Sequence, residues 1–288
     1  MSDATSARSR VGAVAWSLAF MVLGYVGMLS LAGAALAWLA ADRPGQPLSL
    51  GWATAIQAGS GILVYGLLTW AMGRRAMGLS RAELGWTPIA ETGRGFVRGT
   101  VLGIVVAVGA VALGLLTGSG WSLDGGTLGS YLVRLGILAV ILLPPAFMEE
   151  LAFRGLAVAG MARGIGRPSA IVVTSVLFAG AHWANPDLTG LALGNIALAG
   201  MFLALTFFSR GGIGTATGAH WGWNLALAGS AAPVSGLPFD IPWLDFQPGN
   251  PGWLTGGAFG PEGGLLATVA LTAGAIFVIR RRDFREEP

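Results

Sequence analysis

Eight apolar segments follow one another along the chain, and most of them are long enough to cross a bilayer. A transmembrane helix needs about 20 consecutive apolar residues. The apolar segments cover residues 11–40, 52–72, 96–117, 128–148, 169–184, 188–208, 213–231 and 264–280, of which the fifth and seventh are marginal in length and polarity. Only 11% of the residues are charged, against about 25% in soluble globular proteins. The sequence therefore predicts an all-α, polytopic transmembrane helix bundle of about eight spans.

Arginine residues gather in alternate connecting segments of this predicted bundle. They lie near the N-terminus, in residues 73–98, in residues 163–167, at Arg210 and from Arg280 to Arg285, whereas the other loops are acidic apart from Arg43. Basic loops stay on the cytoplasmic side of a membrane. We therefore expect an integral protein of a bacterial plasma membrane with both termini in the cytoplasm. The pI of 10.2 reflects these loops, and without a continuous basic stripe no nucleic-acid partner is expected.

Ionisable residues interrupt the apolar segments at three places. A charged side chain in the middle of a bilayer costs about 2.5–3.5 kcal/mol, so such residues are paired or functional. Residues four apart share one face of a helix, and Glu150 can therefore pair with Arg154, while Glu149 points about 100° away. The side chains in question are Glu149, Glu150, Arg154, His182, His220 and Asn224, and they include both histidines of the chain.

These side chains lie at similar depths in the predicted bundle. At about 1.5 Å per helical residue, Glu149 and His182 lie roughly 20 Å, and His220 roughly 15 Å, from the arginines that flank their helices. They can therefore meet in one cavity between the fourth to seventh spans. A helix that continued from residue 128 to 163 would be too long for one straight span, and Pro144-Pro145 offers a break or kink there.

The chemistry that suits this set is hydrolysis. Peptide hydrolysis needs a base that takes a proton from water and donors aimed at the developing oxyanion, and Glu, His and Asn can supply both. The absence of cysteine excludes a thiol nucleophile and thiolate metal ligands. Glu149, His182 and His220 also form the two-histidine, one-glutamate set of catalytic zinc sites. The cofactor therefore stays open between none, which we favour, and a divalent metal such as zinc.

In their order and spacing, the segments Glu149–Arg154, Phe178–His182 and His220–Asn224 resemble the CPBP family of intramembrane proteases. This family comprises the type II CAAX prenyl endopeptidases and the bacteriocin-processing, Abi-like membrane proteins. The resemblance covers about residues 130–230. It implies that Glu149 activates the hydrolytic water with His182, and that Glu150 pairs with Arg154. It also implies that His220 and Asn224 stabilise the oxyanion.

The resemblance implies an intramembrane endopeptidase that cleaves a membrane-associated protein or peptide. The chain then divides into N-terminal helices (residues 1–125, with a cytoplasmic loop at about 73–95), a protease core (126–231), and an external loop with the last span and a basic tail (232–288). Two alternatives remain. The protein could be a non-proteolytic scaffold or immunity-type factor that keeps the site, or a proton-coupled transporter. A transporter should show repeated halves, and no convincing repeat is present.

Overall fold

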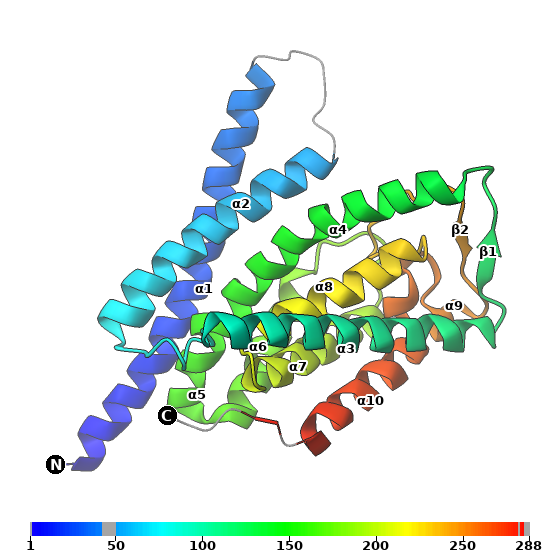
Figure 1. Cartoon of the computed structure of the whole chain (residues 1–288). Coiled ribbons are helices and arrows are strands. Elements are labelled where there is room, and N and C mark those ends of the chain that lie inside the picture. Colours follow the sequence, from blue (N-terminus) through cyan, green and yellow to red (C-terminus); the bar gives the residue numbers. More distant parts are fainter. Residues whose placement is uncertain (1, 42–49, 282, 285–288) are drawn as a thin grey trace.

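The computed structural model describes residues 2–41, 50–281 and 283–284, so Arg43, Arg282 and Arg285 lie outside the described residues. The protein is an all-α bundle, as predicted (Figure 1). Its main helices are α1 (Ser2–Ala41), α2 (Leu50–Leu68), α3 (Ile89–Leu115), α4 (Leu128–Glu150), α5 (Ala159–Ile165), α6 (Arg167–Ala181), α7 (Gly190–Phe208), α8 (Ile213–Gly229) and α10 (Leu265–Arg281). Two wider, π-helical stretches extend them, η1 (Thr69–Ala76) after α2 and η2 (Leu151–Val158) between α4 and α5.

Five helical stretches among the described residues are long and apolar enough to cross a membrane. They are residues 9–41, 51–76, 89–115, 128–165 and 190–208. Helices α6, α8 and α10 are apolar but shorter, with 15, 17 and 17 residues. The membrane-bundle prediction is therefore confirmed, while the count of eight spans stays a prediction.

The fourth predicted span does not end at residue 148, and the proline pair does not break it. Pro144 and Pro145 lie inside α4, and the helical path continues through η2 into α5 as far as Ile165. The departure from helical geometry comes later, at Gly155, with φ −56° and ψ −107°. Prolines are tolerated within membrane helices because neighbouring groups satisfy the freed backbone. The bend therefore follows the acidic pair instead of preceding it.

Two reciprocal hydrogen bonds stabilise the connection between η1 and α3. The backbone N–H of Ser80 donates to Glu83 Oε2 at 2.7 Å, and the N–H of Glu83 donates to Ser80 Oγ at 3.1 Å. This is the capping-box pattern that the sequence contains. The chain then makes a turn that ends at Gly85, where φ is +82° and glycine is favoured.

Among the described residues, helices α3 and α8 share the most extensive helix–helix contact, and Figure 1 shows α3 lying along α8. A Cβ atom added at Gly99 would lie 2.1 Å from the carbonyl oxygen of Thr215, and one added at Gly103 would lie 2.0 Å from that of Ala219. Glycines on α8 face α3 in the same way: a Cβ at Gly218 would lie 2.1 Å from the oxygen of Phe96. Small residues of this kind let membrane helices approach closely. They fix the position of α8, which carries His220 and Asn224.

The segment between α8 and α10, residues 230–264, folds back over one end of the bundle; we call it the covering segment. It contains β2 (Asp245–Gln247), α9 (Gly252–Thr255), η3 (Gly257–Phe259) and η4 (Pro261–Gly263). Strand β2 pairs antiparallel with β1 (Gly120–Ser122), a two-stranded element that the sequence did not predict. Side chains such as Val234, Ile241 and Phe259 join the apolar core of α3, α4, α7 and α8. The segment is therefore packed against the bundle, with β1, β2 and α9 together at one end (Figure 1).

Candidate active site

A buried ion pair lies where α4 passes into η2. Glu150 Oε2 lies 3.4 Å from Arg154 Nε, one helical turn away, and the two side chains are 0% and 1% exposed. The second oxygen, Oε1, lies 2.8 Å from Nδ1 of His220 on α8. Arg154 also donates from Nη2 to the carbonyl oxygen of Gly200 on α7, at 3.3 Å. Glu150 and Arg154 thus pair as expected, and together they connect three helices around the site.

Phe178 on α6 packs among the charged and imidazole groups. The guanidinium carbon of Arg154 lies 4.3 Å from the centre of the Phe178 ring, a cation–π contact. The same ring lies 4.6 Å from the imidazole of His182 and 6.1 Å from that of His220, centre to centre. The Phe178 ring therefore packs against the guanidinium of Arg154 and against the imidazoles of His182 and His220.

Glu149 lies between the two histidines. Its Oε2 atom is 3.8 Å from Nε2 of His182 and 3.8 Å from Nε2 of His220. That oxygen is buried and has no hydrogen-bond partner among the described residues. A distance of 3.8 Å is too long for a direct hydrogen bond, but it suits a water held between the groups. The carboxylate and the two imidazoles thus converge on one point, from α4, from the end of α6 and from α8.

The Nδ1 atoms of both imidazoles already have hydrogen-bond partners, and the Nε2 atoms face Glu149. Nδ1 of His182 lies 2.7 Å from the carbonyl oxygen of Phe178, which can only accept, so Nδ1 of His182 carries a proton. Nδ1 of His220 lies against Glu150 Oε1 and donates to that carboxylate when Glu150 is ionised. In a neutral imidazole Nε2 is then an acceptor, and in a protonated one it is a second donor.

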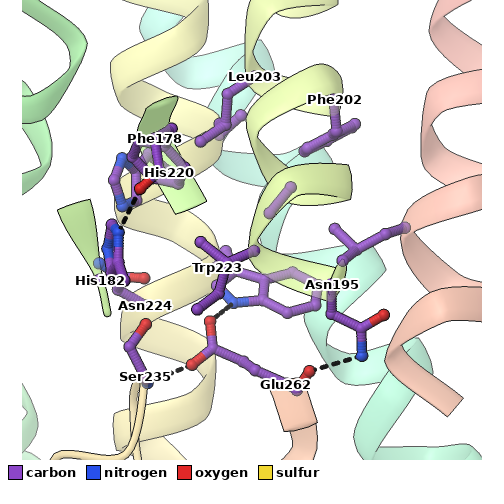
Figure 2. A pocket seen from close by; sticks show the side chains of 14 residues that line it. Phe178, His182, Asn195, Phe202, Leu203, His220, Trp223, Asn224, Ser235 and Glu262 are labelled. Carbon is purple, nitrogen blue, oxygen red and sulfur yellow. Dashed lines mark hydrogen bonds between the residues drawn. The ribbon is translucent and has the colours of Figure 1, made fainter. Parts of the chain in front are cut away.

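A small cavity adjoins the histidines, lined by α6, α7, α8, α10 and the covering segment. Its volume is about 30 Å³, which is room for one or two waters. His182, His220 and Asn224 line it together with apolar side chains such as Phe202 and Leu203, and Figure 2 shows them with the covering segment below. Asn224 follows His220 by one helical turn on α8 and so faces the same cavity.

Sequence reasoning missed two residues that line this cavity, Glu262 and Ser235. Glu262, which looked like a charge in an outer loop, is only 8% exposed and lines the cavity with Ser235. Asn195 on α7 lines it too and donates to the carbonyl oxygens of Glu262 and Gly264 at 2.7 and 2.8 Å. The signal available in the sequence was a single acidic residue in a long stretch rich in glycine and apolar residues.

Glu149, His182 and His220 supply the donor types of a divalent-metal site but are not arranged as one in the described part of the chain. Among the described residues, no group of three or more His, Asp or Glu side chains is placed so that it could hold a metal ion. The Nδ1 atoms of both histidines are engaged elsewhere and leave each Nε2 free, as in histidines that bind a metal through Nε2, and Glu149 Oε2 lies 3.8 Å from each Nε2. The site is therefore described in terms of its own side chains.

Comparison with known families agrees with this geometry. Residues 130–226 match the family model described as type II CAAX prenyl endopeptidase Rce1-like. No curated protein and no solved structure matches the chain. The matched segment contains the acidic pair, Arg154, both histidines and Asn224, and it supports a CAAX-protease-like endopeptidase embedded in the membrane. The chain is therefore similar to the Rce1-like family of type II CAAX prenyl endopeptidases over residues 130–226, about a third of its length.

Proposed function

We propose that the protein hydrolyses a peptide bond of a membrane-associated protein or peptide, with Glu149 as general base. The observation that carries this proposal is the buried Oε2 atom of Glu149, unpartnered within the described structure and 3.8 Å from Nε2 of both histidines. An unsatisfied buried carboxylate oxygen is costly. A water bound there would be oriented by His182 and would lose a proton to Glu149.

The hydroxide formed in this way attacks the carbonyl carbon of the scissile bond, and the carbonyl oxygen becomes an oxyanion. His220 in its protonated form and the amide of Asn224 donate to that oxygen. The negative charge of Glu150 lies beside His220 and balances the imidazolium while Glu149 carries the proton of the water. Glu149 then returns its proton to the leaving amine as the C–N bond breaks. The products are a carboxylic acid and an amine, which become a carboxylate and an ammonium group when the acid proton passes to the amine, and no group of the protein is left modified.

Glu150 and Arg154 act in this scheme as positioning residues. Glu150 holds Nδ1 of His220, and Arg154 holds the other oxygen of Glu150. Breaking a buried pair by removing one partner typically costs about 3–5 kcal/mol. Their substitution should therefore affect both stability and activity, whereas substitution of Glu149 should affect activity alone.

The test uses the purified protein in detergent and a pair of fluorogenic peptides with the same CAAX sequence, one farnesylated and one unmodified. Glu149→Gln keeps the shape of the side chain but removes the base. We expect it to lower the rate by about 10²–10⁴-fold, the usual contribution of a general base. Glu91→Gln, a glutamate at the start of α3, is the matched control and should keep the wild-type rate. Unchanged cleavage in Glu149→Gln would refute the proposed mechanism.

The two peptides also test the substrate class. Faster cleavage of the farnesylated peptide would support a prenylated protein substrate, as the name of the family suggests. Equal cleavage of both would support recognition of the peptide alone. If wild-type protein cleaves neither peptide, but a cellular phenotype of its deletion is complemented by Glu149→Gln, a scaffold role replaces the peptidase.

A further inference from the structure

The covering segment carries a buried carboxylate that the proposed hydrolysis does not use. Glu262 lies in η4 and is 8% exposed. Its Oε1 accepts a hydrogen bond from Nε1 of Trp223 at 2.7 Å, and its Oε2 accepts one from the backbone N–H of Ser235. Figure 2 shows the carboxylate between these two donors, at the edge of the cavity. A buried carboxylate is tolerated only where donors of this kind compensate it.

The partners of Glu262 belong to the helices that carry the site. Trp223 lies on α8 between His220 and Asn224, so a hydrogen bond to its indole fixes that turn of the helix. The backbone of Glu262 is held in turn by Asn195 of α7, and Asn195 Oδ1 accepts from Thr268 of α10 at 2.6 Å. One residue of the covering segment is thus bonded to α8 and α7, and through Asn195 to α10.

A second hydrogen bond joins the covering segment to the chain that follows His182. Asn185, three residues after His182, donates from Nδ2 to the carbonyl oxygen of Ser235 at 2.9 Å. The N–H of the same Ser235 is the donor to Glu262. The chain that follows His182 and the turn that precedes Asn224 are therefore joined through Ser235 and Glu262. These contacts span 27 to 67 residues of sequence, so they are formed by the tertiary fold.

The same residues form the wall of the cavity beside the histidines. Glu262 and Ser235 line it from the covering segment, and Ala219, His220 and Trp223 line it from α8. Residues 235 and 262 lie beyond the segment 130–226 that matches the family. The proposed catalytic side chains therefore come from the family segment, whereas Ser235 and Glu262 come from a part of the chain outside it.

We propose that Glu262 is a positioning residue that latches the covering segment over the cavity and holds the turn of α8 between His220 and Asn224. The proposal rests on the proposed function in one respect, namely that the cavity is part of a hydrolytic site. Without the carboxylate, the indole N–H of Trp223 and the N–H of Ser235 lose their acceptor, and residue 262 of the covering segment no longer accepts a hydrogen bond from α8. The cavity then opens to water-soluble reagents.

Thiol accessibility tests the latch without any substrate, because the chain has no cysteine. Ala219 is fully buried and lines the cavity next to His220. An Ala219→Cys protein in detergent is labelled with a small cationic methanethiosulfonate reagent, in the wild-type background and with Glu262→Gln or Glu262→Ala. Ala58→Cys, on α2 and 1% exposed, is the matched control. If Ala219→Cys does not fold, Ala199→Cys on α7, which also lines the cavity, takes its place.

We expect the thiol at position 219 to react at least 10-fold faster in Glu262→Ala than in the wild-type background. Glu262→Gln should be intermediate, because its amide keeps one acceptor oxygen. The thiol at position 58 should stay slow in all backgrounds. Equal rates at position 219 with and without Glu262 would overturn the proposal. So would acceleration at both positions together, because that result would show general unfolding instead of a local latch.

A double-mutant cycle on cleavage gives the functional readout. Trp223→Phe keeps an aromatic ring but lacks the N–H that donates to Glu262. If Glu262 acts through Trp223, each single substitution should lower kcat/KM about 10-fold. The kcat/KM of the double variant should then be no lower than that of the less active single variant. Effects that multiply would overturn the proposed coupling. If the wild-type protein cleaves no peptide, the proposed function fails, while the labelling experiment still decides the role of Glu262.

Discussion

Gly103 on α3 sets the distance between α3 and the helix that carries His220. The Cβ atom of an alanine there would lie 2.0 Å from the carbonyl oxygen of Ala219 and 2.9 Å from the backbone nitrogen of Trp223. Both contacts are to backbone, so no side chain can rotate away. Ordinary contact begins near 3.4 Å. Gly103→Ala must therefore push α8 away from α3 by roughly 1 Å, at the residue next to His220.

The displacement should affect both stability and catalysis. Overpacking a well-packed interior typically costs about 1–3 kcal/mol. A shift of about 1 Å in a catalytic group can lower the rate by about 10²-fold. We therefore expect Gly103→Ala to melt several degrees below the wild-type protein and to cleave the test peptide about 100-fold more slowly.

The same helix provides the control. A Cβ atom added at Gly109 meets nothing within 4 Å, so Gly109→Ala adds a methyl group to α3 without a clash. Alanine is favoured over glycine within helices by about 1 kcal/mol, and this variant should melt at or above the wild-type temperature. Intrinsic tryptophan fluorescence during heating in detergent measures both variants. If Gly103→Ala melts no lower than Gly109→Ala, then the glycine contact does not set the position of α8.

Three further results are expected. Glu150→Gln and Arg154→Met should each destabilise the protein by about 3–5 kcal/mol, and the double variant should lose less than both together; additive losses of melting temperature would contradict the pairing. Partial burial opposes ionisation of Glu83, but hydrogen bonds from Ser80 and Arg163 outweigh it and lower the pKa of this glutamate below its ordinary value of 4.5. Its contribution to stability is then full at neutral pH and is lost as the pH falls through the lowered pKa. The difference in melting temperature between wild-type protein and Glu83→Gln should therefore be present at pH 7 and shrink as the pH falls below 4.5; a difference that stays unchanged in acid would have another cause. Peptide cleavage should survive prolonged dialysis against EDTA, and loss of activity that zinc restores would show that a metal takes part.

The sequence predicted the helices and the main side chains of the site because both signals are local. Apolar length determines a membrane helix, and ionisable residues in such helices are rare enough to stand out, as Glu149 and His182 do. The spacing of Glu150 and Arg154 predicted their pairing because residues four apart share a helix face. The contact of Glu150 with His220 joins residues 70 apart and had no local signal.

Other features depended on tertiary packing and were missed or misplaced. The proline pair was the strongest local signal for a bend, but the surrounding helices accommodate it, and the bend falls at Gly155. Glu262 looked like a loop charge because the covering segment has no helical period. Its burial depends on Trp223 and Ser235, which approach it only in the folded bundle.

The length of α6 determines how lipid meets the site. Its 15 residues rise about 22 Å, whereas the hydrocarbon layer of a typical membrane is about 30 Å thick. His182 directly follows the last residue of α6, and the next residue, Trp183, is 70% exposed. Acyl chains along this face must shorten or tilt, or headgroups must sink toward the helix end. We therefore expect a thinner bilayer beside α6, which would shorten the path that water takes from the membrane surface to the imidazoles.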